Sequence, residues 1–229
     1  MEAKFRHEHK YLCTDAELRI LQTRLAGLLA PDPHTGEDGT YLIRSIYMDD
    51  HDNRIYYENE DGNDHREKWR IRSYGRDAGL ISLECKQKES GMIRKTACRL
   101  TGEQYERILR GDDPAAMIRA ENPPVLNRYL IQAGTRRFRP ACIVQYRRRP
   151  FIYKNGNVRI TFDQNIASGK DFRKFFDRDL PVRPILRSGQ SLLEVKFDEY
   201  LPDAIYHAIQ MKDMRMVTFS KYFLCRKYG

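Results

Sequence analysis

Two neighbouring stretches of the chain, residues 68–74 and 80–88, alternate between polar and apolar residues. The polar rows are Lys68, Arg70, Arg72 and Tyr74, then Ser82, Glu84, Lys86 and Lys88; the apolar rows are Trp69 and Ile71, then Ile81, Leu83 and Cys85. A period of two is typical of a half-buried β-strand. The link, residues 75–79, is polar, bounded by glycine and of hairpin length. We therefore predict a hairpin with a row of cations on one face.

The same alternation recurs in the other strands that we predict. These strands are residues 4–12, 41–49, 92–100, 141–153, 157–163 and 192–197. For one hairpin alone, a solvated outer face would be the simpler interpretation. A surface sheet, however, does not need a cation in the middle of nearly every strand, whereas a closed antiparallel barrel points one face of every strand inward. We predict such a barrel, with a charged lumen that would repel itself unless a polyanion filled it.

Helix signals separate the strands. Residues 14–17 form a capping box before leucines at helical spacing, and a second capped helix runs from Thr101 to about Gly111. Further helices are predicted over residues 53–59, 125–132, 202–212 and 220–228. Residues 164–190 are expected to be irregular and basic. The mixture predicts an α+β fold, and we interpret residues 1–229 as a single domain with helices flanking the barrel.

Composition narrows the classes of partner. The net charge of +9 favours an anionic partner such as nucleic acid, a phosphorylated small molecule, polyphosphate or an acidic membrane, although solubility alone would also explain it. The five cysteines are scattered, which argues against a disulfide framework or a zinc site. The chain has no apolar run long enough to span a membrane and no signal-peptide pattern. We expect a soluble, cytoplasmic protein.

The predicted inward rows carry cations suited to phosphate. Arginine suits phosphate because its planar fork can bind two oxygens at once and stays charged. The candidate clamps are Arg70, Arg72, Arg148 and Arg159, and the lysines that would add point charges are Lys10, Lys86, Lys95, Lys196 and Lys221. For each cation singly, a surface ion pair is an equally good interpretation, but for the arginines as a set a binding site is the better one. Trp69 lies on the opposite face, which argues against a specific nucleic-acid site built on stacking.

Short motifs follow one another in order from about residue 4 to residue 223. They are Arg6-x-Glu8-x-Lys10-Tyr11, Ser45–Asp49, Trp69–Arg72, Leu83–Lys86, Tyr146–Arg148, Val158–Asp163, Leu193–Phe197 and Ser220–Tyr222. Each motif is weak alone, but the ordered set resembles the VTC domain, the polyphosphate polymerase domain of the vacuolar transporter chaperone family, within the triphosphate tunnel (CYTH-like) metalloenzymes. The resemblance implies an eight-stranded antiparallel tunnel. Relatives with CYTH-type activity open with Glu-x-Glu-x-Lys, whereas this chain has Arg6 at the first position, which favours the VTC branch.

The resemblance also implies a divalent metal, Mn²⁺ or Mg²⁺, and it places the metal-binding glutamate at Glu194. Both ions prefer carboxylate oxygens, water and substrate phosphates as ligands. Glu194 shares the predicted inward face, and Glu8 is a second candidate. For Glu84 and Asp163 we expect ion pairs with neighbouring cations instead.

Together these features predict a metal-dependent polyphosphate polymerase that transfers the γ-phosphate of ATP to a growing inorganic polyphosphate chain in a basic tunnel. Two alternatives stay open. The same clamp with water as the acceptor would be a tripolyphosphatase or nucleoside triphosphatase, and without turnover it would be a polyphosphate-binding module. The eukaryotic complex carries an SPX domain and membrane helices that this sequence lacks, so membrane translocation and regulation by inositol phosphates are not carried over to this chain. We expect a chain that does not span the membrane itself, and a membrane protein is one candidate partner.

Overall fold

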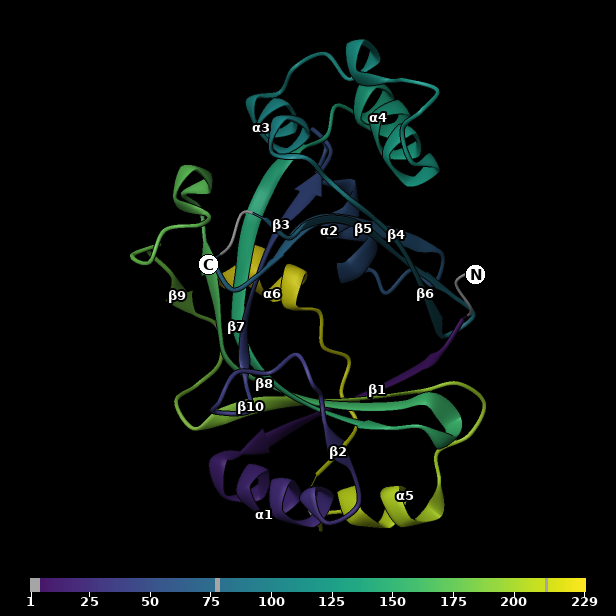
Figure 1. Ribbon diagram of the computed structural model, residues 1–229, viewed down its shortest axis with the longest axis vertical. Helices are drawn as coiled ribbons and strands as arrows, with labels where there is room; N and C mark the ends of the chain where they lie inside the picture. Colours follow the sequence, from purple (N-terminus) through teal and green to yellow (C-terminus); the bar gives the residue numbers. More distant parts are fainter. Residues whose placement is uncertain (1–4, 77–78, 213) are drawn as a thin grey trace.

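In the computed structural model the chain forms a curled antiparallel sheet (Figure 1). Residues 5–76, 79–212 and 214–229 are described, so residue 4 of the first predicted strand and Asp77 and Ala78 of the hairpin link lie outside the described part. The strands are β1 His7–Thr14, β2 Ala30–Pro31, β3 Tyr41–Asp49, β4 Arg66–Tyr74, β5 Ile81–Glu89, β6 Met92–Arg99, β7 Arg139–Tyr153, β8 Val158–Gly169, β9 Arg183–Pro184 and β10 Gln190–Phe197. Their order is β1-β10-β8-β7-β3-β4-β5-β6, and the two-residue strands β2 and β9 pair with β7 and β8. The predicted eight-stranded antiparallel arrangement is confirmed.

The barrel closes at one point. Just before β1, Arg6 exchanges two backbone hydrogen bonds with Ile93 of β6, at 2.9 and 3.0 Å. Along the rest of this seam, within the described part of the chain, the two strands share no hydrogen-bonded ladder. The sheet is therefore a barrel-like trough that is pinned at one end of its β1–β6 seam and open along the remainder.

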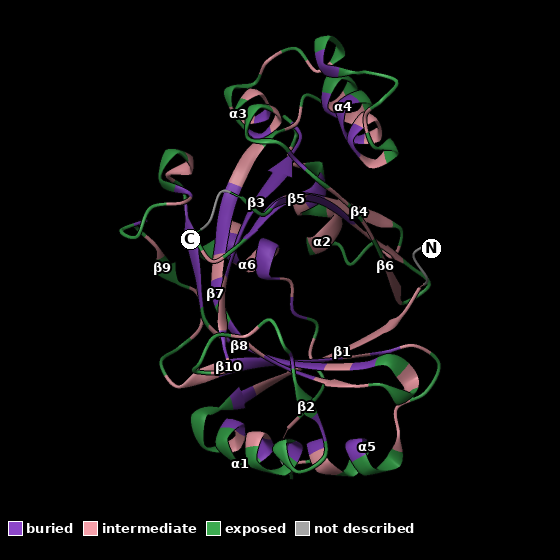
Figure 2. Ribbon diagram, in the orientation of Figure 1, coloured by how far each residue is buried: buried purple, intermediate pink, exposed green. Residues whose placement is uncertain are grey.

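Helices cover the outer, apolar faces of the sheet. The helices are α1 Asp15–Ala26, α2 Arg54–Glu60, α3 Gly102–Arg110, α4 Pro124–Arg136, α5 Asp203–Ile209 and α6 Lys221–Tyr228, with short 3-10 turns at Ala115–Met117, Asn155–Asn157 and Phe172–Lys174. On one side α3 and α4 pack on Trp69, Ile71 and Leu83, and on the other α1 and α5 pack on Leu193 and Val195 (Figures 1 and 2). The apolar rows predicted from the sequence are thus the outer core, and the charged rows face inward.

The last helix, α6, lies between the two walls of the barrel (Figure 1). Tyr222 and Cys225 on this helix are buried against β3 and β7, in a third apolar cluster. Asp49 at the end of β3 anchors the helix. Its carboxylate accepts a hydrogen bond from the Tyr222 hydroxyl and from the backbone N–H groups of Ile55 at 3.0 Å and Tyr56 at 3.2 Å in α2. One buried carboxylate therefore joins β3, α2 and α6.

Three local predictions differ from the structure. Residues 164–169, expected to be irregular, continue β8, because Asn165 adopts a positive φ of 53° and the strand resumes its pairing beyond this residue. Helix α4 runs on to Arg136, and α5 ends at Ile209 rather than near residue 212. Within the described ranges, the helices are all too short or too polar to cross a membrane.

We predict that Asp49→Ala lowers the free energy of unfolding by at least about 2 kcal/mol, since it leaves several buried donors without an acceptor. Urea denaturation measures the change. Asp61→Ala, at the exposed end of α2, is the matched control and should shift the free energy by less than about 0.5 kcal/mol. Equal transitions for the two variants would show that Asp49 does not anchor α6.

Candidate functional site

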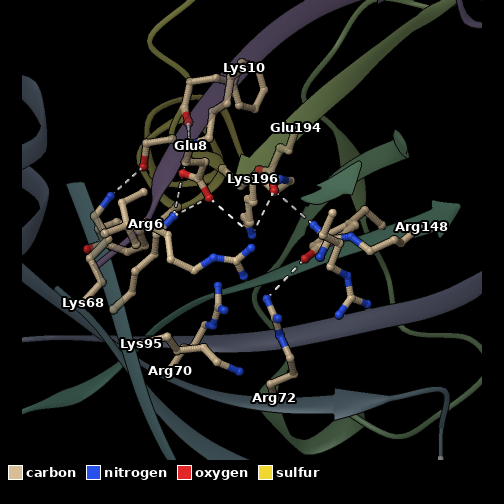
Figure 3. A pocket seen from close by; sticks show the side chains of 18 of the residues that line it. Arg6, Glu8, Lys10, Lys68, Arg70, Arg72, Lys95, Arg148, Glu194 and Lys196 are labelled. Carbon is tan, nitrogen blue, oxygen red and sulfur yellow. Dashed lines mark hydrogen bonds and ion pairs between the residues drawn. The ribbon is translucent and has the colours of Figure 1, made fainter. Parts of the chain in front are cut away.

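A cavity of about 370 Å³ occupies the interior of the barrel. Every site residue predicted from the sequence lines it: Arg70, Arg72, Lys86, Arg148, Arg159, Lys10, Lys95, Lys196, Lys221, Glu194 and Glu8. All of them come from strands far apart in the sequence, except Lys221, which begins α6. In Figure 3 the labelled members of this set point into one space. The tertiary structure therefore brings the whole predicted set together, although the role of each residue is not decided by its position alone.

Strand β4 supplies two arginines at a two-residue spacing. Arg70 donates from Nε and Nη2 to one oxygen of Glu84, at 2.8 and 2.6 Å, and from Nη1 to the Tyr47 hydroxyl at 2.8 Å. Arg72 donates to the Ser45 hydroxyl and to the Tyr146 hydroxyl, each at 3.2 Å. Both guanidinium groups are fixed by neighbours on their own wall of the barrel, so a ligand meets cations that are already oriented.

Glu84 neutralises part of this wall. Besides Arg70, it lies 3.6 Å from Arg72 and 3.0 Å from the Lys95 ammonium. Burial alone would raise the pKa of Glu84, but Arg72, Arg70 and Lys95 hold the pKa well below its usual range. The ion pairs expected for Glu84 are confirmed, and the residue is an anion throughout the working pH range.

A second group of charges lies on β7, β8, β10 and the start of α6. Arg148 binds both oxygens of Asp163, at 2.6 and 2.8 Å, and reaches Glu194 at 3.2 Å. Lys221, at the start of α6, lies 2.6 Å from Asp163 and 2.5 Å from Glu194. Burial would raise the pKa of Glu194, yet Lys221, Lys196 and Arg148 keep it well below its ordinary value. The ion pair expected for Asp163 is confirmed.

Glu8 on β1 contacts lysines from three strands, β1, β5 and β10. Its carboxylate lies 3.0 Å from Lys10, 2.8 Å from Lys86 and 3.3 Å from Lys196. Burial lowers the pKa of Lys86 to about 7 despite the attraction of Glu8. Arg159 stands apart from these clusters, because it pairs at 2.7 Å with Asp32, a residue outside the predicted set.

The cavity continues into a second one of about 300 Å³, which shares Glu8, Lys10, Lys68 and Lys86 with the first. Lys68 donates to the Ser220 hydroxyl at 3.0 Å. Burial, together with the neighbouring cations Lys86, Arg66 and Lys10, lowers the pKa of Lys68 well below its ordinary value. The charged interior therefore extends over two adjoining cavities, and the second one is rich in lysine.

Several lining residues were not predicted as site residues. They are Arg6, His7, Tyr47, Lys68, Tyr74, Ile93, Tyr146, Phe219, Ser220 and Tyr222. The alternation of β4 could have identified Lys68, since it shares the face of Arg70. Tyr146 lies below Arg148 and Lys221, whose charged groups are 5.2 and 5.0 Å from its ring centroid. No sequence signal indicated that the Phe219 carbonyl would accept a hydrogen bond from Lys10, at 2.8 Å.

The donor set fits a divalent cation that shares its ligands with a substrate. Among the described residues, no group of three or more His, Cys, Asp or Glu side chains is placed to hold a metal by itself. Glu8 and Glu194, however, both reach the Lys196 ammonium, at 3.3 and 3.6 Å. A cation is thus already stabilised between these two carboxylates. Mg²⁺ is commonly held by one or two carboxylates together with phosphate oxygens and water, which matches this pair.

Solved structures share this architecture. A proposed adenylyl cyclase from Hippeastrum, described as having a dominant triphosphatase activity, is 13% identical and has a TM-score of 0.59 over 99% of this chain and 96% of its own. A proposed adenylate cyclase from Bacillus halodurans is 15% identical and has a TM-score of 0.52 over 91% of this chain and 87% of its own. At such low identity these likenesses establish the fold alone, and they confirm the triphosphate tunnel fold.

No curated protein is similar enough to this chain to count as a match. The sequence profile of the VTC domain, in contrast, matches residues 5–228, which is almost the entire chain. The order of the motifs, the tunnel that they line and this match agree with one another, and we conclude that the chain belongs to the VTC domain family.

Proposed function

We propose that residues 1–229 form one catalytic domain that transfers the γ-phosphate of ATP to inorganic polyphosphate held in the tunnel. The observation that carries this proposal is the convergence of arginines and lysines from many strands of the sheet on two cavities that share part of their lining. A long polyanion can extend over two such cavities, whereas a closed pocket would hold only one small anion. The membership of the VTC domain family supports the same activity.

The arrangement suits phosphoryl transfer because that reaction depends mostly on positioning and on neutralising charge around the transferred group. Arg70 and Arg72 on β4 and Arg148 on β7 would grip the phosphates of ATP. Lys86 and Lys196 would then meet the oxygens of the acceptor chain. In the balanced step, a terminal oxygen of the acceptor forms a bond to the γ-phosphorus, the bond to the β-phosphate oxygen breaks, and ADP leaves.

Glu194 and Glu8 are the residues that would hold a divalent ion. When bound, Mn²⁺ or Mg²⁺ would neutralise charge on the phosphate oxygens at the reacting end. Lys196 lies between these carboxylates and would have to turn away from them toward phosphate. Because Glu194 keeps Arg148 and Lys221 as neighbours, it remains an anion while this exchange occurs.

A hydrolase is the second candidate, and the description of the Hippeastrum relative as a triphosphatase favours it. The two reactions differ only in whether water or phosphate attacks. The pure protein should be incubated with ATP and Mn²⁺ and its products separated on a gel. Long-chain polyphosphate supports the polymerase, free phosphate alone supports the hydrolase, and stable ATP would leave only a binding module.

We predict that Glu194→Gln abolishes metal-dependent turnover of ATP but retains binding of tripolyphosphate, because the carboxylate charge is lost while the cations remain. Turnover at limiting Mn²⁺ and calorimetric affinity are the two measurements. Glu199→Gln, on the exposed segment that follows β10, is the matched control and should keep full activity. Normal turnover by Glu194→Gln would rule out the assignment of the metal ligand.

We predict that Arg72→Ala weakens tripolyphosphate binding by about 1.5–3 kcal/mol, the range for one charge-assisted hydrogen-bonding group. The stabilisation of the protein by this ligand, measured as the rise in Tm, should shrink accordingly. Arg24→Ala is the matched control, because Arg24 lies on α1 outside the barrel and donates to the Gln210 carbonyl. The same rise in Tm in both variants would contradict a role for Arg72 in phosphate binding.

The half-buried ammonium of Lys68 leads to a pH prediction. Because its pKa in the folded protein is lowered, the unfolded chain binds more protons between that value and about 10.4, and stability rises with pH in this window. Lys68→Met should therefore be more stable than the wild type near neutral pH, and the difference should narrow as the pH rises toward 10. Urea denaturation at several pH values tests this.

Lys88→Met is the control, since Lys88 also lines the second cavity but pairs with Asp64 at 3.4 Å.

A polyanion in the tunnel should offset the destabilisation that Lys68 causes, so tripolyphosphate should stabilise the wild type more than Lys68→Met at pH 7. A difference between Lys68→Met and the wild type that does not vary with pH would refute the prediction.

A further inference from the structure

One aromatic side chain of the tunnel wall is far more exposed than the others. Tyr74, the last residue of β4, has 39% of its surface exposed, whereas Tyr47, Tyr146 and Tyr222 have 7%, 2% and 1%. Tyr74 lines the same cavity as the proposed phosphate clamps. Unlike the buried tyrosines of the same cavity, Tyr74 therefore offers ring surface that the protein itself does not cover.

A second tyrosine supports this ring. Tyr41 on β3 contacts Tyr74 in a T-shaped arrangement, with ring centroids 5.7 Å apart and an interplanar angle of 68°. A T-shaped contact covers at most one face of a ring. The Arg72 guanidinium also lies over the Tyr74 ring, at the long distance of 6.0 Å from its centroid, so the exposed 39% of Tyr74 is the surface left for a planar partner. The Tyr41 hydroxyl in turn accepts a hydrogen bond from Arg159 at 2.9 Å, which fixes the pair against β8.

The pair adjoins the arginines of the tunnel. Arg72, two residues before Tyr74 on β4, has its guanidinium carbon 6.0 Å from the Tyr74 ring centroid. Arg159 contacts Tyr41 directly. If the phosphates of a ligand bind Arg72 and Arg159, the group attached to its first phosphate therefore lies next to the rings of Tyr41 and Tyr74.

The other end of the tunnel differs in composition. Along β4, the inward residues run Tyr74, Arg72, Arg70, Lys68 and Arg66, and Arg66 and Lys88 line the second cavity but not the first. Of the described residues that line the second cavity, the aromatic one is Phe219, which is 5% exposed. An aromatic group of a ligand thus finds a stacking surface at the Tyr74 end and lysines at the other.

We propose that Tyr74, supported by Tyr41, is the stacking platform for the base of a nucleoside triphosphate. This inference rests on the proposed function, because it assumes that the cations bind the triphosphate. It adds a direction: the nucleoside lies at the Tyr74 end, the triphosphate extends inward past Arg72 toward Glu194, and the acceptor chain occupies the lysine end. Stacking is tolerant of base identity, so the platform selects nucleotides over bare phosphates without selecting one base.

The test compares two ligands that share a triphosphate and differ in the base. Calorimetry at fixed ionic strength gives the affinity of the full chain for ATP and for inorganic tripolyphosphate. Tyr74→Leu should weaken ATP binding by about tenfold, the order expected for the loss of one stacked base, and should leave tripolyphosphate binding within about twofold. Tyr74→Phe keeps the ring and should retain the ATP affinity of the wild type.

Tyr206→Leu is the matched control, because Tyr206 is 49% exposed on α5 outside the barrel, and it should change neither affinity. An equal loss of both ligands in Tyr74→Leu would mean that Tyr74 acts by positioning Arg72, which overturns the platform. No loss of either ligand would overturn it as well. A wild-type chain that binds neither ligand would refute the proposed function and this inference together, whereas the first two outcomes refute the inference alone.

Discussion

The burial of many cations inside one barrel is the constraint on which the rest of this structure depends. Like charges a few ångströms apart in a low-dielectric interior repel strongly, and each loses hydration. The chain meets this constraint with carboxylates placed between the cations on each wall. Glu84 joins Arg70 to Lys95, Asp163 and Glu194 join Arg148 to Lys221, and Glu8 joins three lysines. The expectation of a lumen that repels itself without a polyanion is therefore only partly correct.

This compensation has a consequence for binding. A polyphosphate that enters the tunnel competes with carboxylates already in contact with the cations, so its net gain is smaller than the bare positive charge would suggest. The gain in binding free energy is greatest at cations that have the fewest carboxylate neighbours. Lys68, which lies half-buried among Lys86, Arg66 and Lys10 and is hydrogen-bonded to Ser220, is such a cation. Pre-oriented arginines with carboxylate partners hold their geometry, while the less compensated lysines provide attraction.

The outer architecture keeps these side chains in place. Trp69 and Ile71 alternate with Arg70 and Arg72, so the packing of α3 and α4 on the outer face of β4 sets the direction of the arginines on its inner face. Helix α6 enters the barrel, and Asp49 holds it there by accepting a hydrogen bond from the Tyr222 hydroxyl. Lys221 and Ser220 then lie at the start of that helix, within reach of Glu194 and Lys68. A substitution in the outer core or at Asp49 is therefore expected to shift the side chains that line the cavity.

The sequence by itself determined which faces of the strands point inward, because side-chain alternation is a local property with a period of two. That was enough to predict the barrel, the lumen arginines and lysines that lie on strands, and the ion pairs of Glu84 and Asp163. The metal-binding role of Glu194 rested on the resemblance to the VTC domain, and Lys221, which begins α6, belonged to a motif of that resemblance. Alternation does not guarantee that every cation of a strand lines the lumen, and Arg44 illustrates this limit. It is a strand cation, yet it lies on the outer face, buried against the carbonyls of Phe175 and Asp177 at 2.6 and 2.7 Å.

The tertiary structure decided what depends on contacts between distant segments. Four contacts join parts of the chain that share no local pattern: the pairing of Arg159 with Asp32, the hydrogen bond from Lys68 to Ser220, the entry of α6 into the barrel and the bridge at Arg6 that closes the barrel. Strand register and the curvature of the sheet set these contacts, and neither is encoded in the alternation of one strand. For the same reason, the tyrosine pair at one end of the tunnel emerged only when β3 and β4 were seen side by side.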